Sequence, residues 1–164
     1  MNIKHNFTSF FKSFKYAFSG LIYCLKNERN MRFHFCAAFY VLMFIRFYDL
    51  SSAQKAAVYL TIGLVISLEA VNTAIEAAVD LSANGIKPSA KIAKDCAAGA
   101  VLAAAIAAIF VGVSVFWDLE TLRKLGRYLS DNSFAMVQLI VSVLLSLTVI
   151  FLPKGNKRKE NMNE

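Results

Sequence analysis

The alternation of apolar and polar positions divides the chain into one amphipathic segment and four uniformly apolar ones. Residues 1–32 carry large apolar side chains, mostly phenylalanines, on one narrow helical face, which is typical of a helix lying at a membrane surface. The four later segments approach the roughly 20 residues that a helix needs to cross a bilayer. We expect these spans at residues 33–48, 57–79, 96–117 and 134–152, joined by a connecting loop at 118–133 and followed by a basic tail at 153–164. The predicted fold is therefore an all-α integral membrane protein with an N-terminal amphipathic surface helix.

The second expected span contains a row of polar residues: Glu69, Asn72, Glu76 and Asp80. Offsets of three, seven and eleven residues fall within about 80° of one another on a helix, so the four side chains share one face. Near the bilayer centre a carboxylate costs about 2.5–3.5 kcal/mol, whereas an apolar residue contributes only about 0.3–0.6 kcal/mol. The row therefore must face protein, water or a metal ion, and this face is the candidate site.

Composition supports the membrane interpretation and narrows the partners. The chain is 57% hydrophobic and 18% charged, which excludes an ordinary soluble domain. The net charge of +7 comes from basic residues that flank the apolar segments, so we expect contact with phospholipid headgroups and no nucleic acid. Three cysteines without a spacing motif predict neither a disulfide framework nor a zinc site.

The basic residues also predict the orientation in the membrane. If both termini lie in the cytoplasm, 13 of the 18 lysines and arginines lie there as well, as the positive-inside rule requires. The same orientation places Glu28, Glu76, Asp80, Lys94 and Asp95 on the cytoplasmic side, where ATP is available.

This group of residues suits phosphoryl transfer. Glu28 and Glu76 are hard oxygen ligands of the kind that hold Mg²⁺ together with substrate phosphates. Lys94, at the start of the third span, can neutralise phosphate charge, and Asn72 can orient a neighbouring carboxylate. Glu69 lies about 10 Å deeper than Glu76, where it can take a proton from a hydroxyl at headgroup depth. Since the chain contains no P-loop, we expect carboxylates, metal and lysine to bind Mg-ATP for transfer to a lipid alcohol.

Two other classes of function stay open at this point. A proton-coupled transporter also needs buried carboxylates, but it does not require Glu28, Lys94 and Asp95 on one side of the membrane. A non-catalytic membrane scaffold would use the polar row only for packing, and Glu69→Gln would then leave any activity unchanged.

The run from Glu69 to Asp80, EAVNTAIEAAVD, resembles the signature of the prokaryotic diacylglycerol kinase family. The stretches KNERNMR at 26–32 and AKD at 93–95 fit the same family, and the resemblance covers residues 7–117. It implies a lipid kinase of the bacterial cytoplasmic membrane, with a three-helix membrane core at 33–117 and a homotrimer whose sites are shared between subunits.

The resemblance also implies a role for individual residues. Glu69 would be the catalytic base, and Glu28 and Glu76 would be the metal ligands for Mg²⁺. The nucleotide would be bound by Tyr16, Glu28, Glu76, Lys94 and Asp95, with support from Asn72 and Asp80.

The chain departs from the family pattern in several places. Ser9 replaces an arginine of the proteobacterial members, His34 replaces an acidic residue, and the loop with Lys87 lacks the usual Glu-Tyr-His. The stretches at 27–32 and 90–95 look more like members that phosphorylate undecaprenol, yet no residue distinguishes undecaprenol from diacylglycerol. The span at 134–152 lies outside the family core, as an anchor, an oligomer contact or a remnant of a fusion.

Overall fold

The computed structural model describes residues 3–82 and 88–153, and this part of the chain contains helices and no strand. The elements are α1 (Ile3–Asn27), α2 (Arg29–Phe44), a 3₁₀ turn η1 (Ile45–Phe47), α3 (Ser52–Ser82), α4 (Pro88–Phe116), α5 (Leu119–Asp131) and α6 (Ser133–Phe151). The predicted all-α fold is confirmed.

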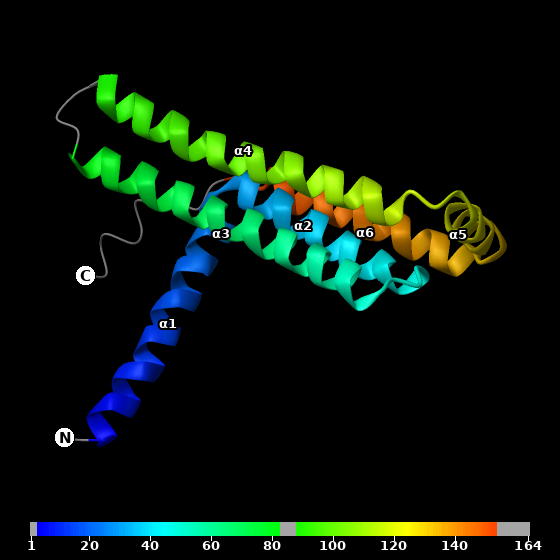
Figure 1. The fold of residues 1–164 in the computed structure, drawn as a ribbon, viewed down its shortest axis with the longest axis horizontal. Helices are drawn as coiled ribbons and strands as arrows, with labels where there is room; N and C mark the ends of the chain where they lie inside the picture. Colours follow the sequence, from blue (N-terminus) through cyan, green and yellow to red (C-terminus); the bar gives the residue numbers. More distant parts are fainter. Residues whose placement is uncertain (1–2, 83–87, 154–164) are drawn as a thin grey trace.

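Helices α3 and α4 form an antiparallel pair that provides the main interhelical packing (Figure 1). The buried face of α4 presents Ala97, Val101 and Ala104, which recur at helical spacing. Small side chains at such spacing let two helices approach closely in a membrane, where no hydrophobic driving force separates protein from lipid. On α3, Glu69 and Asn72 of the polar row are buried within the protein, and Asp80 at the end of the row pairs with Lys94 of α4.

Helix α2 packs against α3, and α6 packs against α2 on a separate side (Figure 1). The hydroxyl of Tyr40 on α2 lies 2.9 Å from Oγ of Ser146 and donates to Oγ of Ser142 at 3.3 Å. Both serines lie one turn apart on the mainly apolar α6, and in lipid such hydroxyls require protein partners. These contacts set the register of α6 on α2.

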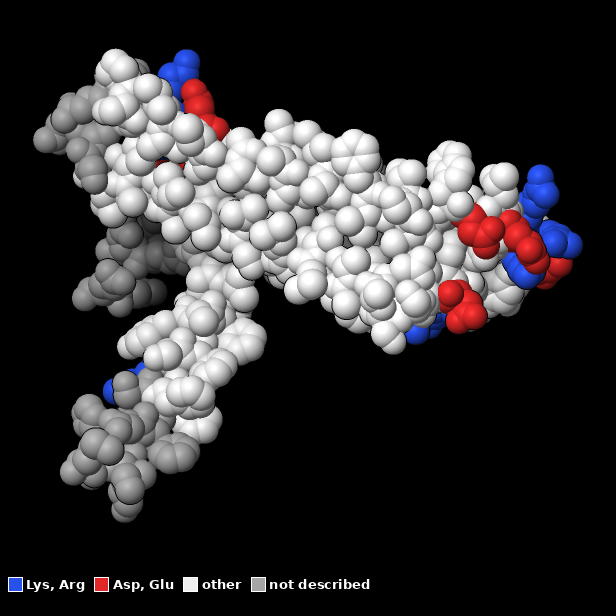
Figure 2. Space-filling model, in the orientation of Figure 1, with Lys and Arg blue, Asp and Glu red and all other residues white. Residues whose placement is uncertain are grey.

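Within the described residues, three helices are long and apolar enough to cross a membrane: Ser52–Leu81, Pro88–Phe116 and Ser133–Phe151. The span expected at 33–48 falls on α2 and η1, and α2 begins earlier and has only 16 residues. On the face shown in Figure 2, charged side chains gather at both ends of the helix bundle, and the surface between them carries none. The chain is a multi-pass membrane protein.

The segment expected as a connecting loop at 118–133 is instead mostly helical. Asp118 begins α5 as its N-cap, accepting hydrogen bonds from the backbone N–H groups of Glu120 (3.1 Å) and Thr121 (3.2 Å). Asn132 ends α5 and caps α6 by accepting from the N–H of Ala135 at 3.1 Å. The expectation of a loop is wrong. The segment is rich in polar residues, as loops are, but two of these residues, Asp118 and Asn132, cap helices at the correct spacing. Most of the expected basic tail, residues 154–164, lies outside the described residues.

Helix α1 leaves the bundle at a steep angle, and its described aromatic side chains are exposed (Figure 1). It ends at Asn27, where the backbone of Glu28 is extended with φ −111° and ψ 122°. One amphipathic segment expected at 1–32 is thus divided between α1 and the first turn of α2. The position of α1 at the membrane surface stays a prediction.

Candidate functional site

The corner between α1 and α2 places Glu28 at the edge of the bundle. Because its backbone is extended, the chain changes direction here, and Glu28 becomes the N-cap residue of α2. The side chain makes no capping hydrogen bond to α2. It lines a pocket instead.

This pocket has a volume of about 500 Å³ and joins three parts of the chain. It is lined by Glu28, Arg29, Asn30 and Arg32 at the α1–α2 corner, by Glu76 of α3, and by Ile150, Phe151 and Leu152 at the end of α6. We call it the carboxylate pocket. Two carboxylates and two guanidinium groups therefore face one space, a combination suited to a metal ion and a polyanion held together.

The side chains of the polar row become progressively more exposed toward the C-terminal end of α3. Glu69 is 2% exposed and Asn72 is also buried, whereas Glu76 is half-buried and Asp80 is exposed. The amide of Asn72 donates a hydrogen bond to Oε1 of Glu76 at 3.1 Å, and the Thr73 hydroxyl donates to the backbone carbonyl of Glu69 at 3.1 Å. The row faces protein at its deep end, as the cost of a lipid-facing carboxylate predicts.

Three acidic side chains interact electrostatically at this site. The charges of Glu28 and Glu76 both act on the carboxyl group of Glu69. Like charges that interact in this way favour a bound cation or a bound proton. The part of the chain that the structure describes contains no group of three or more His, Cys, Asp or Glu placed to hold a metal ion. Two carboxylates that share a cation with substrate phosphates fit this donor set, and that is how Mg²⁺ is commonly bound.

Two buried polar atoms beside the pocket have no hydrogen-bond partner within the described residues: Nε of Arg32 and Oδ1 of Asn72. Arg32 is only 5% exposed. A buried polar group without a partner costs about 1–3 kcal/mol, so both atoms are candidates for contact with a ligand. Nε of Arg32 can donate to a phosphate oxygen, and Oδ1 of Asn72 can accept from a hydroxyl group or from water.

Other expected site residues lie elsewhere in the chain. Lys94 at the start of α4 forms an ion pair with Asp80 at the end of α3, and Asp95 next to it is exposed. Tyr16 is exposed on α1. None of these four residues lines the carboxylate pocket of the single chain.

Of the three residues that depart from the family pattern, the structure describes the side chain of His34. His34 lies half-buried on α2 and lines a small, mainly apolar pocket with Val65. The side chain of Ser9 and the whole of Lys87 lie outside the described residues.

The sequence did not single out Arg29, Asn30 and Arg32 as site residues, although they line the carboxylate pocket. A signal was present, because they belong to a polar cluster that directly precedes an apolar segment. No local signal pointed to the end of α6, whose place beside the pocket depends on tertiary packing.

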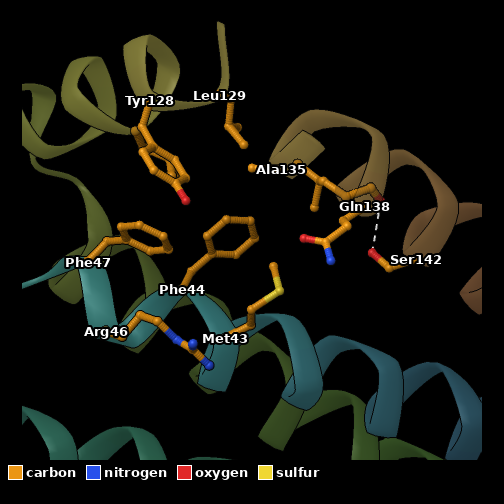
Figure 3. A pocket seen from close by; sticks show the side chains of 11 residues that line it. Met43, Phe44, Arg46, Phe47, Tyr128, Leu129, Ala135, Gln138 and Ser142 are labelled. Atoms are coloured by element: carbon orange, nitrogen blue, oxygen red, sulfur yellow. Dashed lines mark hydrogen bonds between the residues drawn. The ribbon is translucent and has the colours of Figure 1, made fainter. Parts of the chain in front are cut away.

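A second pocket of about 330 Å³ lies between the C-terminal end of α2, η1, α5 and α6 (Figure 3). The rings of Phe44, Phe47 and Tyr128 and the amide of Gln138 point into it. Among the described residues that line it there is a cation, Arg46, but no carboxylate. It therefore lacks the ligands for metal-assisted phosphoryl transfer.

Comparison with known proteins shows which family the chain resembles. The family model of prokaryotic diacylglycerol kinase matches residues 15–116. A Synechocystis protein named diacylglycerol kinase is 46% identical over 101 residues, which are 61% of this chain and 58% of that protein. A Bacillus subtilis protein named undecaprenol kinase is 41% identical over 113 residues, which are 69% of this chain and 92% of that protein. The polar wall of the carboxylate pocket lies inside the family match, and α6 lies outside it.

Proposed function

Because the chain belongs to the prokaryotic diacylglycerol kinase family, we propose that it transfers the γ-phosphoryl group of ATP to the hydroxyl group of a membrane lipid alcohol. The observation that carries this proposal is the carboxylate pocket, in which Glu28 and Glu76 share one space with Arg29 and Arg32. The charges of both carboxylates act on the buried carboxyl group of Glu69.

In the proposed reaction, the hydroxyl oxygen of the lipid forms a bond to the γ-phosphorus of ATP. The bond from this phosphorus to the β–γ bridging oxygen breaks, and its electron pair leaves with ADP. Glu69 accepts the hydroxyl proton as general base. Its burial excludes bulk water, which favours transfer to the lipid over hydrolysis of ATP.

Glu28 and Glu76 would hold a Mg²⁺ ion, which supplies charge neutralisation for the phosphate oxygens. Asn72 keeps the Glu76 carboxylate oriented through its amide hydrogen bond. The guanidinium groups of Arg29 and Arg32 provide donors for the polyphosphate chain, and Nε of Arg32 has no hydrogen-bond partner among the described residues.

We further propose that both termini lie in the cytoplasm, so that the carboxylate pocket opens to cytoplasmic ATP. The distribution of lysine and arginine supports this orientation. We also propose a homotrimer with shared sites, in which Tyr16, Lys94 and Asp95 of one copy complete the site of another. This arrangement is motivated by the lining of the pocket that a single chain forms, which does not include these three residues.

The acceptor is either undecaprenol or diacylglycerol, the two lipids in the names of the relatives. The test is phosphorylation of a lipid panel by the purified protein with Mg-ATP: diacylglycerol, ceramide and undecaprenol, with dolichol as a control. One lipid should become labelled from γ-³²P-ATP, and Glu69→Gln should abolish labelling. If no lipid is labelled while the protein carries proton flux in liposomes, the transporter interpretation replaces the kinase.

A further inference from the structure

Helix α6 lies outside the family match at 15–116, yet its last residues line the carboxylate pocket. The α6 side of the pocket is apolar and consists of Ile150, Phe151 and Leu152, whereas the corner at Glu28 is charged. A helix that served only as a membrane anchor would not need to end at this place.

The end of α6 is held there by specific contacts. The Tyr40 hydroxyl bonds to Ser142 and Ser146, which fixes α6 against α2. From Ser146 to Phe151 the helix rises only about 7 Å, so this polar contact determines where Phe151 lies. The helix ends at Phe151, and the N–H of its C-cap residue Leu152 bonds to the carbonyl of Val149.

The two sides of the carboxylate pocket have different chemistry. One side presents the charges of Glu28, Arg29 and Glu76, and the other presents apolar side chains from α6. Phe151 is 68% exposed and Leu152 is also exposed, so both retain apolar surface that a ligand can cover. A nucleotide needs only the charged side. A lipid alcohol needs both, because its hydroxyl must reach the phosphate while its hydrocarbon body remains out of water.

We propose that the end of α6 is the acceptor wall of this protein: Phe151 and Leu152 contact the hydrocarbon next to the reacting hydroxyl of the lipid alcohol. This inference rests on the proposed lipid kinase function. It assigns to α6 a role in acceptor binding, beyond the phosphate chemistry of the family core. The wall positions the acceptor and takes no part in the proton transfer.

The test is steady-state kinetics of the full chain in mixed micelles, with the lipid alcohol identified by the panel above. Phe151→Ala and Leu152→Ala should each raise the KM for the lipid, expressed as its mole fraction in the micelle, by about three- to tenfold. The KM for ATP and the kcat at saturating lipid should remain near the wild-type values, since only uniform acceptor binding is removed.

Phe134→Ala is the matched control, because Phe134 is 72% exposed at the other end of the same helix. It should leave both KM values unchanged. Tyr40→Phe keeps the ring but removes the hydroxyl contacts to Ser142 and Ser146, and it should also raise the lipid KM.

The possible failures are distinguishable. If the wild-type protein phosphorylates no lipid, the proposed function fails. If it is active but Phe151→Ala and Leu152→Ala both match Phe134→Ala, the acceptor wall is refuted. A rise in the KM for ATP instead of the lipid would also refute it, because α6 would then act on the nucleotide.

Discussion

The side-chain amide of Asn72 donates a hydrogen bond to Oε1 of Glu76, one turn further along α3, at 3.1 Å. This bond connects the buried part of the polar row to the carboxylate that lines the pocket. It orients the Glu76 carboxylate, and Oδ1 of the same Asn72 amide is buried without a hydrogen-bond partner among the described residues. Asn72 therefore orients the Glu76 carboxylate for contact with a ligand.

Asn72→Ala should weaken the response of the enzyme to Mg²⁺, because removal of a residue that orients a metal ligand usually costs about 10–100-fold in metal affinity or activity. Titration of kinase activity with Mg²⁺ at saturating ATP and lipid measures the shift. Thr61→Val is the control on the same helix, because the Thr61 hydroxyl bonds to the backbone carbonyl of Ala57, one turn earlier, and lies outside the polar row. An unchanged Mg²⁺ requirement in Asn72→Ala would remove Asn72 from the site.

Glu69→Gln should lower kcat by about 10²–10⁴-fold, the usual contribution of a general base, and leave the KM for ATP near wild type. The substitution keeps the size of a side chain that is buried in the helix packing. Initial rates with labelled ATP measure the loss, and thermal unfolding in detergent checks the fold. Full activity in a stably folded variant would favour the scaffold interpretation.

The ion pair between Asp80 and Lys94 connects the exposed ends of α3 and α4, and at this exposure it should contribute no more than about 1 kcal/mol to stability. Asp80→Asn and Lys94→Ala should thus unfold at similar temperatures. If Lys94 also contacts phosphate, Lys94→Ala should raise the KM for ATP more than Asp80→Asn does. Equal ATP kinetics in the two variants would mean that the lysine serves only the ion pair.

The N-cap of α5 predicts a response to acid. Hydrogen bonds from the Thr121 hydroxyl and from the N–H of Glu120 hold the pKa of Asp118 below its usual 3.8. A carboxyl group with a lower pKa in the folded protein stabilises the fold above its unfolded pKa, and this contribution is lost as pH falls through the folded pKa. The stabilising contribution of the Asp118 cap to α5 should therefore be lost only below pH 3.8.

Trp117 is the single tryptophan and precedes Asp118, so its fluorescence reports this transition. Asp118→Asn keeps a capping side chain without a titrating proton, and its fluorescence should lose the acid transition. An identical transition in both proteins would assign the acid response to another group.

Much of this architecture follows from local sequence pattern. Long apolar runs predicted the α3, α4 and α6 helices, because backbone groups in lipid must be hydrogen-bonded within the helix. The high cost of a lipid-facing carboxylate predicted that Glu69 faces protein, and it is buried there. The local pattern did not predict α5, because its many polar residues resemble those of a loop. Its N-cap is recognised only from the position of Asp118 two and three residues before the N–H groups that it accepts from.

The amino-acid sequence alone determined the membrane helices and the face of α3 that carries the polar row, because helical period and the bilayer act on neighbouring residues. Only the tertiary structure decided which residues share a pocket. The Tyr40–Ser146 contact joins residues 106 positions apart and brings the end of α6 to Glu28 and Glu76. The α3–α4 pair likewise directs Lys94 to Asp80. Such contacts depend on how whole helices pack, which no local pattern specifies.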